Sequence, residues 1–119
     1  MASTPEGKVK GQVRSLLAEY QGIYTYWPVP SGYGKTNLDV LGCYRGRFFL
    51  IETKAAGKKP TLRQVEEIQA VDAAMGRTFV ITGLNDPVLG ELRAWLDQLT
   101  RDVPYDTHIT PDPVRRRTV

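Results

Sequence analysis

The sequence has one cysteine, Cys43, and one histidine, His108. A single cysteine excludes an intrachain disulfide and a cysteine-rich zinc site. No stretch approaches the roughly 18 consecutive apolar residues of a membrane-spanning helix. The opening MASTPEGKVKGQ also lacks the apolar core of a signal peptide. We therefore expect a cytoplasmic protein without a membrane partner, in a bacterial cell or a phage-infected host.

The net charge of the sequence is also small. The formal net charge is only +3, and the isoelectric point is near 9.1. This mild excess permits a polyanionic partner but does not require one. The 119 residues suffice for one domain with its own core. The compact form would suit a phage or prophage protein.

Hydrophobic periodicity predicts three helices and four strands. The first helix begins at Pro5, is capped by Ser3 or Thr4, and ends by Gly22. The other expected elements are strands Ile23–Pro28, Leu38–Tyr44, Arg47–Thr53 and Arg77–Thr82, with helices from Thr61 to Gly76 and from Asp86 to Leu99. The order α-β-β-β-α-β-α indicates an α/β fold with a mixed four-stranded sheet flanked by helices. Residues 1–103 would form one domain, and 104–119 a loosely held Pro/Arg-rich tail.

In the second helix, apolar residues recur along one side, which we expect to face the sheet. They are Leu62, Val65, Ile68 and either Val71 or Ala74.

Charged residues end the third predicted strand, directly after the apolar run Phe48–Ile51. Side chains alternate along a strand, so Glu52 and Lys54 share one face at its C-terminal end. If Arg45 and Gly46 form a tight turn, counting outward from the turn pairs Asp39 with Glu52. A shift of one residue would break this pairing.

Two carboxylates at this spacing repel unless positive charge lies between them. Lys54 could supply part of that charge. A divalent cation such as Mg²⁺ would do so better, because it prefers carboxylate, carbonyl and water oxygens. Such an ion can activate water against a phosphodiester, with Lys54 beside that water. The alternative is a surface cluster of ion pairs without catalysis.

The pattern Asp39, twelve residues, then Glu52-Thr53-Lys54 resembles the PD-(D/E)xK nuclease signature. The surroundings resemble one branch of that superfamily, the VRR-NUC (virus-type replication-repair nuclease) domains. The similarity covers Tyr26 to about Gly83, with Leu38 standing where many members have proline. That position shapes the loop rather than the chemistry. The matching residues are Gly34, Asp39, Gly46, Glu52, Lys54, Gln64 and Gly76.

The resemblance implies a restriction-endonuclease-like fold and a set of catalytic roles. Asp39, Glu52 and the backbone carbonyl of Thr53 would bind Mg²⁺ or Mn²⁺. Lys54 would be the catalytic lysine. Gln64 would position the site or the substrate, although a solvated helix residue is the competing interpretation.

Such nucleases often carry a further glutamate on the first helix, and Glu6 is the best candidate. It precedes Val9 by three residues and Val13 by seven. This spacing places Glu6 on the same side of the helix as these two valines. The competing interpretation is a glutamate that merely favours the helix dipole.

Basic residues surround the motif and predict contacts with phosphates. Those nearest to it are Lys35, Lys58, Lys59 and Arg63, while Lys8, Lys10 and Arg14 lie on the first helix. Tyr33, in a glycine-flanked loop, could stack on an unpaired base. For any one of these residues, an ordinary solvated or packed position remains the alternative.

Together these features predict a metal-dependent nuclease that hydrolyses phosphodiester bonds in DNA and selects its substrate by structure. Two alternatives stay open. One is a Holliday-junction resolvase that acts as a homodimer, since two-fold symmetry fits a symmetric junction. The other is a DNA-binding module that has the fold but does not cut.

Overall fold

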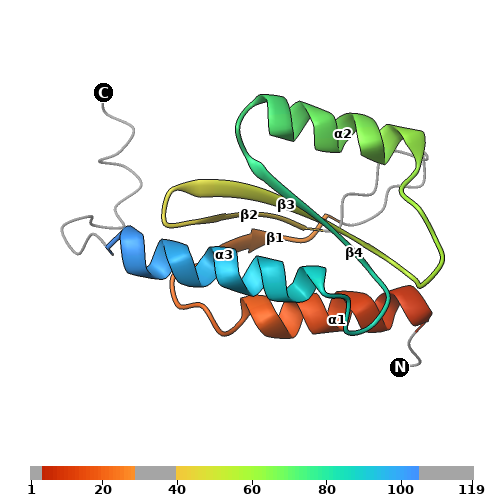
Figure 1. Ribbon diagram of the computed structural model, residues 1–119, viewed down its shortest axis with the longest axis horizontal. Coiled ribbons are helices and arrows are strands. Elements are labelled where there is room, and N and C mark those ends of the chain that lie inside the picture. Colours follow the sequence, from red (N-terminus) through yellow and green to blue (C-terminus); the bar gives the residue numbers. More distant parts are fainter. Residues whose placement is uncertain (1–3, 29–39, 105–119) are drawn as a thin grey trace.

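A computed structural model of the chain describes residues 4–28 and 40–104. It shows a mixed four-stranded sheet with the strand order β1-β2-β3-β4 and three flanking helices (Figure 1). The α/β fold class and the element order are those predicted. In chain order the elements are α1 (Pro5–Leu17), β1 (Tyr24–Tyr26), β2 (Val40–Tyr44), β3 (Arg47–Lys54), α2 (Leu62–Ala73), β4 (Arg77–Thr82) and α3 (Val88–Asp102).

The hairpin between β2 and β3 has the predicted turn and register. Arg45 and Gly46 both have positive φ, +52° and +83°, as the two central residues of a type I′ turn require. Tyr44 therefore lies opposite Arg47, and Val40 lies opposite Ile51. Asp39 precedes Val40 and lies outside the described residues. β3 pairs with β4 in parallel, through the crossover that contains α2.

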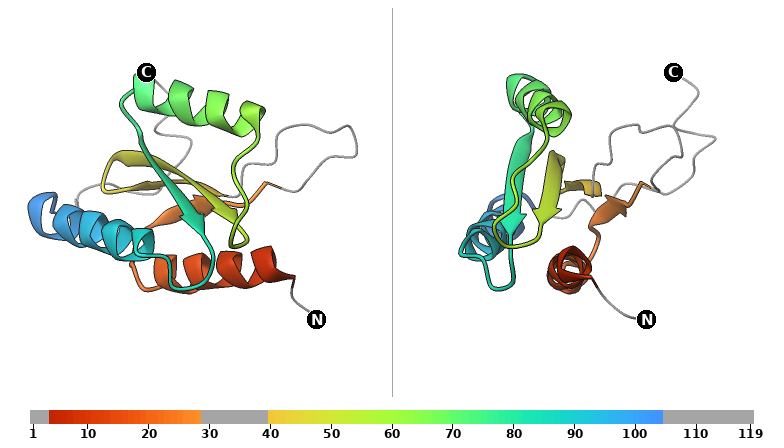
Figure 2. Two further views of the ribbon diagram at one scale, coloured as in Figure 1. Left: turned by 45° about the vertical axis from the view of Figure 1, so that its right-hand side comes forward. Right: turned by 90° about the vertical axis from the view of Figure 1, so that its right-hand side faces the viewer.

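The helices cover both faces of the sheet. α1 and α3 lie side by side on one face, and α2 lies on the other (Figure 2). Phe49 and Ile51 of β3 join the core beneath α1 and α3. Because strand side chains alternate, Leu50 and Glu52 point to the opposite face. From α1 and α3 that core takes Val9, Val13, Leu16, Leu17, Leu92, Leu96 and Leu99.

The start of α1 is as predicted, but its end is not. Pro5 begins the helix, and the Thr4 side chain accepts a hydrogen bond from the Gly7 amide at 3.0 Å. The helix ends at Leu17 rather than continuing towards Gly22. Tyr20 donates its amide to the Leu17 carbonyl, three residues back. The chain therefore tightens into shorter-range turns after Leu17.

The predicted apolar side of α2 is partly wrong. Leu62 is 75% exposed, whereas Gln64 is the buried residue of this helix. Val65 and Ile68 are half-buried, as expected of the side that faces the sheet. Spacing alone cannot show which residue of the first turn points inward. Here a polar contact, described below, turns Gln64 towards β3.

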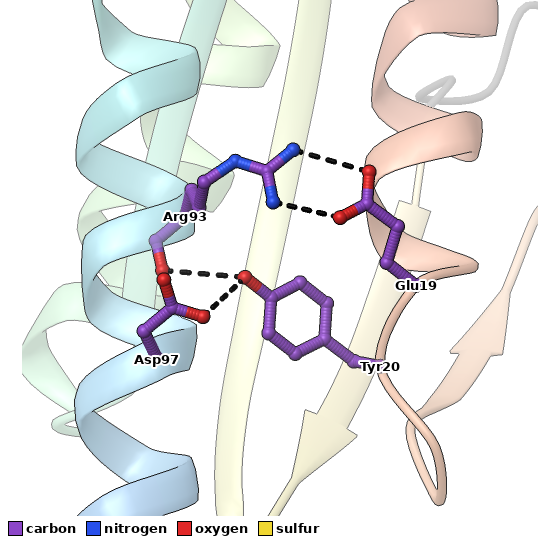
Figure 3. A network of polar contacts seen from close by, with 4 residues as sticks. All are labelled: Glu19, Tyr20, Arg93 and Asp97. Carbon is purple, nitrogen blue, oxygen red and sulfur yellow. Dashed lines mark hydrogen bonds and ion pairs between the residues drawn. The ribbon is translucent and has the colours of Figure 1, made fainter.

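A network of polar contacts joins the end of α1 to α3 (Figure 3). Tyr20 donates its hydroxyl hydrogen to Asp97 at 2.7 Å, and Arg93 contacts Glu19 at 2.7 Å and 3.1 Å. The hydrogen bond from Arg93 lowers the pKa of Glu19. Burial, with the bond to Asp97, raises the pKa of Tyr20 to about 12. These contacts link the turn after α1 to α3, beside the core residues Leu16 and Leu17 that pack α1 on the sheet.

Gly42 leaves no room for a side chain within the sheet, and its replacement should destabilise the fold. A Cβ atom there would collide with the Phe49 ring and lie 2.6 Å from the Tyr24 carbonyl oxygen. We expect Gly42→Ala to lower the free energy of unfolding by about 1–3 kcal/mol in urea denaturation. Gly90→Ala is the matched control, because nothing lies within 4 Å of its added Cβ. It should be neutral or stabilising by up to roughly 1 kcal/mol. Equal stability of the two variants would refute the close-packing explanation.

Among residues 4–28 and 40–104, no helix combines the length and the apolar character needed to cross a membrane.

Candidate active site

Glu52 lies at the C-terminal end of β3, where the apolar part of the strand gives way to charge. Its side chain is fully buried, as is that of Thr53, while Lys54 is half-buried. Burying a carboxylate costs free energy unless other groups stabilise it. A fully buried glutamate two residues before a half-buried lysine is therefore unusual at a strand end that has only a structural role.

Gln64 connects Glu52 to the start of α2. Its side-chain oxygen accepts the Thr61 amide hydrogen at 2.9 Å, and its own amide donates to the Thr61 hydroxyl at 3.2 Å. These reciprocal bonds form a capping box. The Gln64 side-chain nitrogen donates to Glu52 Oε1 at 3.5 Å. Gln64 is only 7% exposed, so it is not the solvated helix residue of the competing interpretation.

The N-terminal end of α1 lies beside the loop that follows β3 (Figures 1 and 2). A cavity of about 580 Å³ separates them. Glu6 and Lys54 both line it, so the structure brings the first helix to the catalytic lysine of the predicted site. Glu6 is half-buried and sits in the first turn of α1. This position fits both of its proposed roles.

The predicted nucleic-acid contacts divide into three groups. Lys58 and Lys59 are exposed and line the cavity. Arg63 is exposed at the start of α2 but is not among the described residues that line it. Lys35 and Tyr33 lie outside the described residues.

Oxygen atoms are the candidate donors for the predicted metal ion. Glu52 supplies a carboxylate and Thr53 a backbone carbonyl, which are the ligand types that Mg²⁺ and Mn²⁺ favour. Within residues 4–28 and 40–104, no group of three or more His, Cys, Asp or Glu side chains could hold a metal ion. These donor types fit a hard cation. The second carboxylate of the predicted metal site would come from Asp39, which lies outside the described residues.

One feature of the site went unrecognised in the sequence. The pattern Thr61-x-x-Gln64 is a capping-box signature that could have been read directly. Lys10, one of the basic residues noted on the first helix, lines the cavity from α1. Its place there depends on how α1 docks on the sheet, and no local pattern carries that information.

No protein-family model matches the chain, and comparison with curated proteins and with solved structures finds no match. The proposed function therefore rests on the side chains of this chain and on the sequence resemblance described above.

Gln64 should matter to both stability and activity. We expect Gln64→Ala to lower the free energy of unfolding by about 1 kcal/mol, because the cap loses one of its two bonds. Any metal-dependent cleavage should fall roughly 10- to 100-fold, the usual cost of losing a partner that orients a ligand. Gln69→Ala is the control, since Gln69 is exposed on the same helix. A Gln64→Ala variant as active as Gln69→Ala would show that Gln64 only caps the helix.

Proposed function

We propose that the chain is a metal-dependent nuclease that hydrolyses phosphodiester bonds in DNA and resembles the VRR-NUC domains. The observation that carries the proposal is the fully buried Glu52, held by Gln64, two residues before a lysine that borders a basic cavity. A carboxylate, a carbonyl and a lysine at one strand end suit phosphodiester hydrolysis, in which a water must be deprotonated and phosphate charge stabilised.

In this proposal Asp39, Glu52 and the Thr53 carbonyl hold Mg²⁺ or Mn²⁺. The Val40–Ile51 pair supports the set, because continuing the same register by one residue would pair Asp39 with Glu52. The bound ion supplies Lewis-acid activation of water and stabilisation of charge on the phosphate. Gln64 keeps the Glu52 carboxylate in one orientation by donating to Oε1.

Lys54 acts on the water and on the phosphate. Lys54 is half-buried at the end of β3 and lines the open cavity, where a phosphate can approach from solvent. A compact point charge with three N–H donors can orient the attacking water and stabilise the negative charge that develops on phosphorus oxygens. Water attacks the phosphorus directly as the P–O bond to the leaving ester oxygen breaks. The water gives up a proton to bulk solvent and the leaving oxygen takes one up, so no covalent enzyme intermediate forms.

The test is cleavage of single-stranded, duplex, flap and four-way-junction DNA with Mg²⁺ or Mn²⁺. We expect the wild type to cut at least one of these substrates and EDTA to abolish the reaction. Asp39→Ala and Lys54→Ala should both lose cleavage. Equal cleavage by all three proteins would overturn the mechanism. Junction binding without cutting would favour the non-catalytic module, and cleavage of junctions alone by a dimer would favour the resolvase.

A further inference from the structure

The cavity at the end of the sheet gathers four lysines from segments far apart in the sequence. Lys10 comes from α1, Lys54 ends β3, and Lys58 and Lys59 follow in the loop. Glu6 is the one acidic side chain among the described residues of its lining. Lysines that converge on one hollow repel each other more than lysines spread over a surface. Such an arrangement favours the binding of an anion.

The loop that carries two of these lysines has a defined turn. The Lys58 amide donates to the Ala55 carbonyl at 3.0 Å, and Gly57 has a φ of +82° at the third position of that turn. The Gly83 amide donates to the Lys54 carbonyl at 2.8 Å, which ties the start of the loop to the end of β4. The backbone therefore holds Lys58 and Lys59 at the cavity without needing a ligand to order it.

The helix end itself is a poor anion site here. Pro5 has no amide hydrogen, the Gly7 amide is bonded to the Thr4 hydroxyl, and the Lys8 amide is bonded to the Thr4 carbonyl. Binding must then come chiefly from the lysine side chains. Ammonium groups act as point charges, in the way that lysines commonly bind phosphate. At about 580 Å³ the cavity lies within the roughly 300–1,000 Å³ typical of small-ligand pockets.

We propose that this cavity binds a second phosphate of the DNA strand, next to the one being cut, and that Lys10 is one of its ligands. This rests on the proposed nuclease function. Lys54 borders both places and so couples the bound phosphate to the scissile one. An internal phosphodiester and a terminal phosphate share the chemistry that the lysines recognise.

The test measures DNA binding in EDTA, where no cutting occurs. Fluorescent single-stranded and flap oligonucleotides are titrated with wild type, Lys10→Gln and Lys59→Gln at several salt concentrations. We expect each variant to bind more weakly for every sequence and to reduce the slope of log affinity against log salt by about 1. Arg101→Gln is the control, because it removes the same charge from an exposed position near the far end of α3. It should keep the wild-type slope.

Oligonucleotides with and without a 5′-phosphate distinguish binding of a terminal phosphate from binding of an internal phosphodiester. A gain in affinity from the 5′-phosphate that Lys10→Gln abolishes assigns a terminal phosphate, and equal affinity assigns an internal one. If Lys10→Gln and Lys59→Gln, with unchanged thermal melting, keep the wild-type slope, the phosphate site is wrong even where the wild type cleaves DNA. If the slopes fall but no metal ion supports cleavage by the wild type, the site stands and the nuclease proposal fails.

Discussion

Glu52→Gln is expected to reduce DNA cleavage by about 1,000-fold or more, which corresponds to about 4 kcal/mol of transition-state stabilisation. The change keeps the shape of a fully buried side chain and removes only its charge. The new amide oxygen can still accept from Gln64, which now contacts Glu52 Oε1 at 3.5 Å. The fold should therefore survive while the anionic ligand of the proposed metal site is lost.

Three measurements separate these effects. Initial cleavage rates over a Mn²⁺ titration report on metal use, thermal denaturation reports on the fold, and DNA affinity in EDTA reports on binding. Glu66→Gln is the matched control, because it removes the same charge from an exposed position on α2. Cleavage by Glu52→Gln within threefold of the control would exclude Glu52 as a metal ligand. A large loss of thermal stability would instead indicate that its charge is structural.

The parts of the fold that short-range chemistry determines could be predicted from the sequence. Arg45 and Gly46 set the hairpin register, because a two-residue turn leaves one pairing of the flanking strands. β4 has the predicted bounds, Arg77–Thr82, since β-branched and aromatic residues run between the turn signals on each side. Thr61 caps α2 as expected.

The parts that depend on long-range packing could not be predicted from local periodicity, and only the resemblance implied a role for Gln64 in the site. The inward turn of Gln64 in place of Leu62 follows from its contact with Glu52, a residue on another element. Lys10 lines the cavity because of how α1 packs on the sheet through core residues such as Val9 and Val13. Local periodicity cannot predict either contact. It indicates which residues share one side of an element, but not which other element that side packs against.

The same limit applies to the candidate site. Strand alternation was enough to place Glu52 and Lys54 on one face, at the end of β3. It could not show that Glu52 is fully buried while Lys54 borders solvent. Glu52 is covered by α2, whose Gln64 contacts it, whereas Lys54 lines the cavity beside the first turn of α1, and these elements come together only when the whole domain packs. It also separates the two proposed roles, a metal ligand in the interior and a lysine facing the phosphate.

Replacing Lys54 tests the second role. We expect Lys54→Met to lower the single-turnover cleavage rate at saturating DNA by about 100- to 10,000-fold, the range for a group that transfers or orients a proton. Methionine keeps most of the aliphatic length of this half-buried side chain. The salt slope of binding in EDTA should fall by only about 1, as for any lysine that contacts one phosphate.

Lys54→Arg shows which property of the lysine matters. Arginine keeps the positive charge but stays protonated and has a planar set of donors. If Lys54 orients the water or accepts its proton, the arginine variant remains nearly as slow as Lys54→Met. If Lys54 only attracts phosphate, arginine restores most of the rate. Arg101→Met, changed at an exposed position remote from the cavity, should cut at the wild-type rate. Should Lys54→Met cut as fast as this control, Lys54 belongs to the phosphate-binding surface alone, and the chemistry at Glu52 proceeds without it.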